Sequence, residues 1–160
     1  IYALIGGVAA ADHRSIAAFF VNRKAVVVVA WFLIVTAILF GLLWLSEDVP
    51  ALLAGVRPQS VIDMALPTNP VHILDLAFFL PAVIATGVLL LKRRPFAYTV
   101  APALIVFLIL TGIPILITPV VQSARGEMAS WGVVGPIGAL TLALLGLLAW
   151  LLSTIKAHAR

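Results

Sequence analysis

The chain has 160 residues, of which 64% are apolar and only 10% are charged, and its net charge is +4. A soluble domain carries about 25% charged residues, so this composition excludes a water-soluble globule and indicates a protein whose main solvent is lipid. The sequence contains no cysteine, which excludes disulfides and Cys-ligated zinc or iron–sulfur centres. Metalloprotease, phosphate-loop and serine-hydrolase motifs are also absent from it.

The first eleven residues, IYALIGGVAAA, are apolar but too few to cross a bilayer, which takes about 20 residues. The charged residues Asp12 and Arg14 come after this apolar run, whereas a signal peptide has its basic region before it. We therefore interpret residues 1–11 as the tail of an upstream membrane helix. An interfacial or disordered leader is the alternative.

Four longer apolar segments follow, and each is long enough for a helix to cross a hydrocarbon core of about 30 Å. The sequence therefore predicts an all-α fold: a polytopic transmembrane helical bundle that forms a single domain over residues 1–160. The expected spans are residues 25–45, 71–91, 98–121 and 132–152.

Residues 46–70, between the first two spans, are expected to form an extracytoplasmic loop with two short interfacial helices. Asp48 suits an N-terminal cap, Pro50 a first turn and Gly55 a helix stop, which predicts one short helix there. The second short helix would follow Pro58 and end before Pro67.

Basic residues are sorted to one side of this predicted topology. That side holds eight basic residues and one acid, whereas the other holds two basic residues and five acids. Cytoplasmic loops collect Lys and Arg, so we predict a multi-pass protein of the bacterial cytoplasmic (inner) membrane with its C-terminus in the cytoplasm. The basic residues are then expected to face the lipid bilayer and its anionic headgroups, and no nucleic acid is expected as a partner. The basic residues of the cytoplasmic side are Arg14, Arg23, Lys24, Lys92, Arg93, Arg94, Lys156 and Arg160.

The segment around Asn69 is the candidate ligand or pocket site. Asn69 before Pro70 predicts a capped helix start, and His72 and Asp75 then stand three residues apart on one helical face, within reach of a hydrogen bond. An ionisable residue at the edge of a membrane helix is by default a functional-site hypothesis. The alternative is structural, with Asp75 accepting from His72, Thr68 or a loop residue and fixing the loop to the second span.

The sequence predicts no catalytic residue, cofactor or metal. One His and one Asp are too few for a metal site unless acids from other loops join them. Haem is disfavoured because His13 and His158 both fall on the cytoplasmic side, so no pair of histidines is placed to clamp it.

Gly132, Gly135 and Gly138 recur every three residues in the fourth span. Small residues let helix backbones approach closely in membranes. We therefore expect this face to pack against another helix, and it is a candidate contact for a partner protein.

The stretch LPTNPVHILDLAFFLP, preceded by VPALLAG and followed by GVLLLKRRPFAY and APALIVFLIL, resembles a family of uncharacterised polytopic membrane proteins of actinobacteria and related bacteria. The resemblance covers about Leu42 to Ile117. It implies membership and topology, including further helices upstream of Ala25, and no activity.

These observations favour an integral membrane protein with an outward-facing polar pocket near His72 and Asp75, without an assigned activity. One alternative is a subunit of a small-solute or ion transporter, with further ionisable residues in upstream helices. Another is a membrane enzyme acting on a lipid-linked or periplasmic substrate. The enzyme hypothesis predicts that the acids of the outer side, Glu47, Asp48, Asp63 and Glu127, converge on His72.

Overall fold

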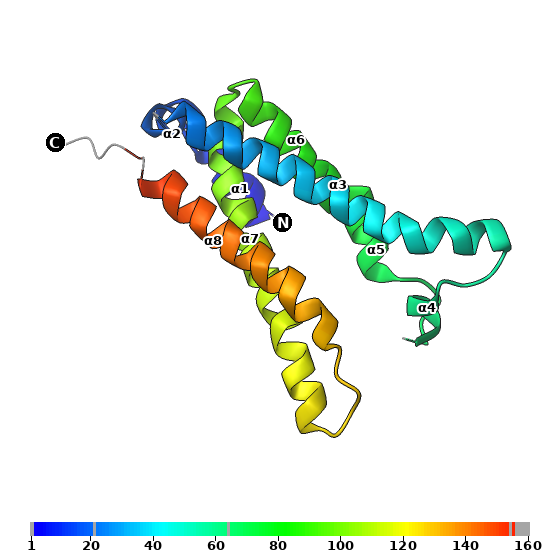
Figure 1. Cartoon of the computed structure of the whole chain (residues 1–160). Coiled ribbons are helices and arrows are strands. Elements are labelled where there is room, and N and C mark those ends of the chain that lie inside the picture. Colours follow the sequence, from blue (N-terminus) through cyan, green and yellow to red (C-terminus); the bar gives the residue numbers. More distant parts are fainter. Residues whose placement is uncertain (1, 21, 64, 154, 156–160) are drawn as a thin grey trace.

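The computed structural model describes residues 2–20, 22–63, 65–153 and 155, and the side chains from residue 6 onward (Figure 1). Within this part of the chain the regular elements are helices, and the only extended pairing is a single bridge between Phe20 and Ile155. Lys156, His158 and Arg160, which were assigned to the cytoplasmic side, lie outside the described residues. The elements are α1 (Tyr2–Ala10), α2 (His13–Phe19), α3 (Arg23–Ala54), α4 (Gln59–Asp63), α5 (Pro70–Leu74), the π-helical turn η1 (Asp75–Phe79), α6 (Leu80–Leu91), α7 (Pro95–Ala124), the 3₁₀ turn η2 (Trp131–Val133) and α8 (Val134–Ser153).

Four continuous helical stretches are long and apolar enough to cross a membrane. They are Arg23–Ala54, Pro70–Leu91, Pro95–Ala124 and Trp131–Ser153, and each contains one of the spans expected from the sequence. The predicted all-α fold with four spans is therefore confirmed. Residues 2–10 are also helical, as an upstream helix would be, but their origin in a longer helix stays a prediction.

Helix α3 is longer than expected and corrects the prediction of a separate short helix after Asp48. The side chain of Asn22 caps its start by accepting from the backbone N–H groups of Lys24 and Ala25, and Gly55 ends it with a left-handed φ of 65°. The helix passes through Pro50 without a break. Its 32 residues extend about 48 Å at about 1.5 Å each, well beyond a hydrocarbon core of about 30 Å. The last turns of α3 therefore project past the apolar layer. The expected second short helix is present as α4.

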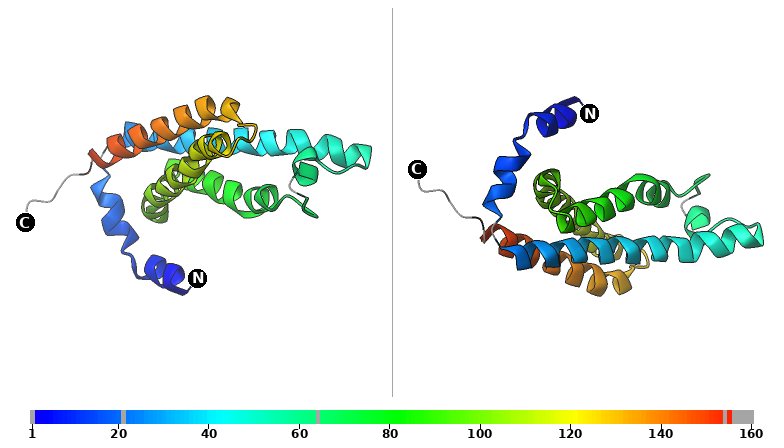
Figure 2. Two further views of the ribbon diagram at one scale, coloured as in Figure 1. Left: turned by 90° about the horizontal axis from the view of Figure 1, so that it is seen from below. Right: turned by 90° about the horizontal axis from the view of Figure 1, so that it is seen from above.

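The long helices form two antiparallel hairpins (Figure 1). Helix α3 packs along η1 and α6, and α7 packs along α8. The hairpins meet where α6 turns into α7 and diverge toward their other ends, while α1 stands apart from both (Figure 2). Helix α2 packs on the start of α7, where His13 Nδ1 lies 2.8 Å from Thr99 Oγ1.

The closest helix contacts use glycines that were not singled out in the sequence. A Cβ added to Gly87 of α6 would lie 2.8 Å from the carbonyl oxygen of Ala30 in α3, and one added to Gly112 of α7 would lie 2.5 Å from Oγ1 of Thr141 in α8. The glycines of the fourth span behave differently. A Cβ at Gly132 or Gly135 would meet nothing within 4 Å among the described residues, and one at Gly138 would be in ordinary contact with Leu116. The close packing expected for this face is therefore not made with the described residues, and a partner there stays a prediction.

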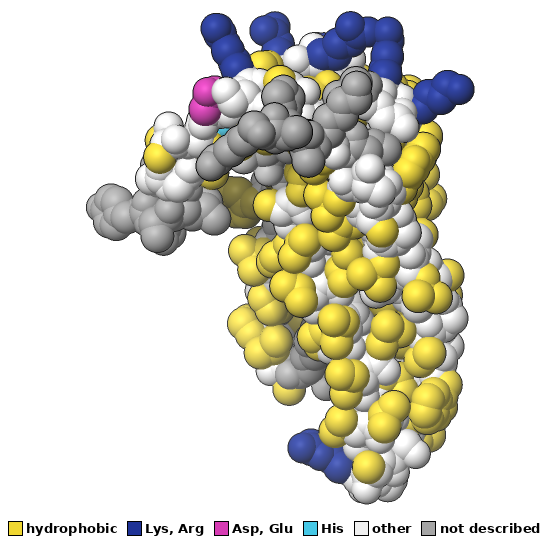
Figure 3. Space-filling view, turned by 90° about the vertical axis from the view of Figure 1, so that its left-hand side faces the viewer, with side chains coloured by type: hydrophobic (Ala, Val, Ile, Leu, Met, Phe, Trp, Pro, Cys, Tyr) yellow, Lys and Arg dark blue, Asp and Glu magenta, His cyan; other side chains and the backbone are white. Residues whose placement is uncertain are grey.

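Charged side chains gather at the ends of the molecule and apolar side chains cover the flanks between them (Figure 3). The start of α3 and the turn from α6 to α7 lie at the basic end, with Arg23, Lys24, Lys92, Arg93 and Arg94. The loops after α3 and α7 lie at the opposite ends of the hairpins. The charge sorting read from the sequence therefore matches the arrangement of the described helix ends.

Candidate functional site

The site lies at the end of the first hairpin that is opposite the basic end, where the second membrane stretch begins against α3. The side chain of Asn69 accepts hydrogen bonds from the backbone N–H groups of Val71 (3.0 Å) and His72 (3.3 Å), and Pro70 occupies the first helical position. This is the capped helix start that the sequence predicted. The cap fixes where α5 begins, and so determines which residues of α3 the first turn of α5 faces.

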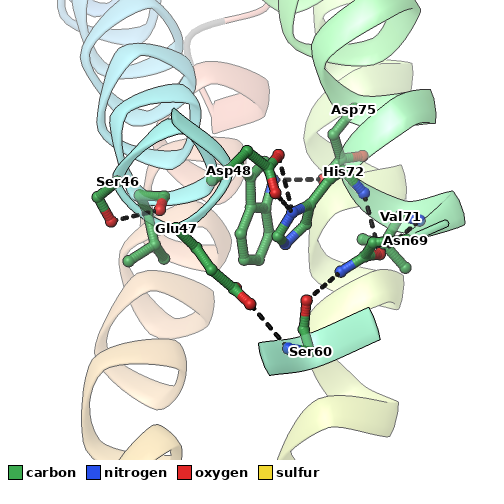
Figure 4. Close-up of polar contacts among 10 residues, drawn as sticks. Ser46, Glu47, Asp48, Ser60, Asn69, Val71, His72 and Asp75 are labelled. Carbon is green, nitrogen blue, oxygen red and sulfur yellow. Dashed lines mark hydrogen bonds and ion pairs between the residues drawn. The ribbon is translucent and has the colours of Figure 1, made fainter. Parts of the chain in front are cut away.

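His72 is buried against α3, with only 4% of its surface exposed. Its Nδ1 lies 3.0 and 3.1 Å from the two carboxyl oxygens of Asp48 (Figure 4), and its ring stacks on the indole of Trp44 at a centroid distance of 4.4 Å. An ionised carboxylate only accepts hydrogen bonds, so a bond to an ionised Asp48 requires the proton of the neutral ring to be on Nδ1. The neutral imidazole then presents a lone pair at Nε2, and the protonated ring presents an N–H there.

Asp75 does not bond to His72, which corrects the hydrogen bond expected from their spacing. Its Oδ2 accepts from Nε1 of Trp44 at 3.0 Å. The reason is the antiparallel packing of the two helices. His72 and Asp75, three residues apart, face Asp48 and Trp44, four residues apart on α3, so each side chain finds its partner across the helix interface. Asp75 therefore acts on His72 only through Trp44, whose indole it holds in place.

The π-helical turn η1 follows directly and keeps the helix facing α3. The backbone N–H of Leu80 donates to the carbonyl of Asp75, five residues earlier, and Pro81 next to it has no N–H to continue a regular ladder. Asp75 bonds to Trp44, and the side chain of Leu80 lies near Gly41, which is one turn before Trp44 in α3. The wide turn therefore places two residues five apart on the same helix face, and such turns are frequent at functional sites.

The outer loop is fixed to both helices by a second set of bonds (Figure 4). Nδ2 of Asn69 donates to Oγ of Ser60 at 3.1 Å, and the backbone N–H of Ser60 donates to Oε1 of Glu47 at 2.8 Å. Ser60 belongs to α4, so this short helix is held beside the pair of Asp48 and His72. The loop, through α4, is thus held in place as one side of the site.

A cleft of about 360 Å³ opens beside His72. Its polar lining includes Asp48, Arg57, Thr68 and Asn69, and its apolar lining comes from α3, α4 and the start of the second stretch: Leu52, Val56, Val61, Ile73 and Leu76. Its volume falls in the range of small-molecule sites, about 300 to 1,000 Å³. The cleft therefore combines a few polar groups with apolar walls, as ligand sites usually do.

The second ring nitrogen of His72 is turned away from Asp48 (Figure 4). Across the described residues, the only hydrogen-bond partner of the His72 ring is Asp48, through Nδ1. Every buried side-chain nitrogen or oxygen in that same part of the chain has a hydrogen-bond partner. Nε2 is therefore not fully enclosed by the described residues, and it belongs to a side chain that lines the cleft.

The acids of the outer side do not converge on His72 as the enzyme hypothesis predicted. Asp48 contacts the ring, Glu47 is linked to His72 through the hydrogen bonds of Ser60 and Asn69, and Asp63 accepts from Gln59 at 2.7 Å instead. Glu127 follows α7, in the second hairpin, and lines a different cavity. Among the described residues no group of three His, Cys, Asp or Glu side chains is placed to hold a metal ion.

Sequence reasoning found Asn69, His72 and Asp75, named Asp48 only as one of four acids in the enzyme hypothesis, and missed Trp44. The available signal was the spacing of four between Trp44 and Asp48, which places them on one face of a helix that must pack against its neighbour. The register between the two helices was needed to pair them. That register is set by how the two helices pack, and the spacing of residues within one helix does not reveal it.

The class of protein is defined by the four spans, the charged ends and the apolar flanks: the chain is a multi-pass integral membrane protein. No protein-family model, no curated protein and no solved structure matches it.

Proposed function

We propose that the cleft beside His72 binds a small amphipathic ligand at the outer face of the membrane, with Nε2 of His72 as its main polar contact. The observation that supports this most strongly is the His72 ring itself. It is buried, oriented by Asp48 and stacked on Trp44, it lines the cleft, and its second nitrogen has no hydrogen-bond partner among the described residues. A polar atom on a buried ring normally finds a partner in the protein, in water or in a ligand.

The ligand class follows from the walls of the cleft. A neutral imidazole ring accepts at Nε2, so a hydroxyl or ammonium group of the ligand is the expected donor. Thr68 and Asn69 add polar contacts on one side, and Leu52 and Ile73 add apolar contacts on the other. A molecule with one polar head and a short apolar portion suits this lining.

The orientation belongs to the same proposal. The basic end of the bundle is the cytoplasmic side of a bacterial inner membrane, by the rule that short cytoplasmic loops collect Lys and Arg. The cleft then opens to the extracytoplasmic side. Membership in the actinobacterial family, which the LPTNPVHILDLAFFLP stretch resembles, stays a prediction.

Native mass spectrometry of the protein purified from its own membranes in mild detergent tests the binding. Wild type is compared with His72→Gln and Asp48→Asn, and His13→Gln serves as the matched control because His13 lies at the other end of the bundle, beside Thr99. Thermal unfolding of each variant by circular dichroism separates loss of a ligand from loss of the fold.

The expected result is a discrete bound mass that is present in wild type and His13→Gln and lost in His72→Gln and Asp48→Asn. The same bound mass in all four proteins, or only a heterogeneous set of lipids, contradicts the proposal. In that case the His72 pair is a structural clasp between the outer loop and the second membrane stretch.

A further inference from the structure

A second cavity, of about 220 Å³, lies at the basic end of the bundle, far from the His72 cleft. It is formed where α2 leads into α3 and where α6 turns into α7. Two arginines, Arg23 and Arg93, line it together with Tyr98 and apolar residues of α3 and α6. Two segments distant in the sequence therefore bring two guanidinium groups to one hollow.

Neither arginine is neutralised by the part of the chain that the structure describes. The ion pair found there is that of His72 with Asp48, at the opposite end. The one acid expected at the basic end, Asp12, uses its carboxyl to accept from Ser15 and from the backbone N–H of Arg14. Guanidinium groups without carboxylate partners are suited to bind phosphate, which they contact with paired N–H donors.

The backbone at Arg93 points to the same role. Arg93 has a left-handed φ of 55° in a turn closed by bonds from its N–H to the carbonyl of Leu90 and from Arg94 N–H to the carbonyl of Leu89, both 2.9 Å. Glycine is the usual residue at this position of a helix end, because a side chain is strained in the left-handed conformation. Arg93 adopts this conformation with its side chain lining the cavity, whereas glycine would adopt it without strain.

The remaining lining is apolar and aromatic. Val27 and Leu91 are half-buried, and Phe20 packs on Tyr98 at a centroid distance of 5.6 Å. The cavity thus continues from charged groups at the helix ends to apolar side chains on the flank, along the direction in which a phospholipid stands in a leaflet. A free anion would use only the charged part.

We propose that this cavity is a binding site for the phosphate headgroup of an anionic phospholipid, with Arg23 and Arg93 contacting the phosphate and an acyl chain lying along Val27 and Leu91. The site is independent of the His72 cleft, and its ligand reaches it from the leaflet at the basic end.

The test is a native mass spectrometry titration of the purified protein with phosphatidylglycerol, with phosphatidylcholine and inorganic phosphate as separate arms. The double variant Arg23→Gln with Arg93→Gln is compared with Lys24→Gln with Arg94→Gln, which removes the same charge from neighbouring residues that do not line the cavity. Arg93→Gly is a second test variant that keeps the fold, because glycine adopts the left-handed turn without strain.

The expected result is one tightly bound phosphatidylglycerol, weakened about tenfold in Arg23→Gln/Arg93→Gln and several-fold in Arg93→Gly, and less than twofold in Lys24→Gln/Arg94→Gln. Equal weakening by both double variants, or none by either, would overturn the proposal, since binding would then depend on overall charge or on other residues. Equal binding of phosphatidylcholine excludes an anionic lipid site. Displacement of the lipid by millimolar phosphate assigns the site to the free anion instead.

Discussion

Gly87 gives the prediction with the clearest magnitude. At this position α6 lies so close to α3 that there is no room for a side chain. A Cβ at this position would lie 2.6 Å from Cγ1 of Ile34 and 2.8 Å from the carbonyl oxygen of Ala30, where ordinary contact begins at 3.4 Å. Gly87→Ala therefore forces the helices apart by about 0.6 to 0.8 Å, the shortfall in these two distances. Overpacking of this kind costs about 1 to 3 kcal/mol, whereas Ala in place of a helical Gly returns up to about 1 kcal/mol.

The net expectation is a loss of about 1 to 2 kcal/mol in the free energy of unfolding of Gly87→Ala. The assay is unfolding by sodium dodecyl sulfate from mild-detergent micelles, followed by circular dichroism. Gly135→Ala is the matched control, because a Cβ there meets nothing within 4 Å among the described residues. Adding Ile34→Ala to Gly87→Ala is expected to leave the protein destabilised, because the clash with the backbone oxygen of Ala30 persists. A Gly87→Ala protein as stable as Gly135→Ala would refute the packing of α6 on α3.

Three further predictions concern other parts of the bundle. Gly112→Ala is expected to destabilise the α7–α8 hairpin and Thr141→Ala to restore it, since the clash there is with the Thr141 hydroxyl alone; unfolding of the single and double variants measures this, and a missing rescue counts against the contact. Trp44→Phe removes a hydrogen bond to a carboxyl group and should lower the free energy of unfolding by about 1 to 3 kcal/mol; an unchanged unfolding curve would contradict the Trp44–Asp75 bond. Because the chain has no cysteine, single cysteines at Arg57 and Lys92 can report topology in intact cells. A membrane-impermeant maleimide should label Arg57→Cys and not Lys92→Cys. The opposite labelling pattern would contradict the proposed orientation.

The fold was predictable because span length and charge sorting are properties of the sequence alone. An uncharged segment of about 20 residues can cross a bilayer whatever its neighbours are, so all four helices were found. The extent of α3 was not predictable in this way. Asp48 and Pro50 have the local features of a helix start, but the helix continues through them, and the carboxyl of Asp48 is used across the interface by His72.

The site was predictable only in part, for a related reason. Asn69 caps its own helix, which is a local interaction, and that prediction is confirmed. The partners of His72 and Asp75 depend on the register between two helices, and so do the close contacts at Gly87 and Gly112. A local spacing indicates which residues share a face, but it does not say which residues of another helix they meet.

The most direct test of the account is the tautomer of His72, because the proposed site requires Asp48 to hold Nδ1–H and leave Nε2 for the cleft. The chain has only three histidines, so ¹⁵N-histidine labelling gives a spectrum in which the His72 signal is assigned by its loss in His72→Gln. The account predicts that neutral His72 carries its proton on Nδ1, and that Asp48→Ala abolishes this preference. A His72 ring with its proton on Nε2, unaffected by Asp48→Ala, would contradict the site as proposed.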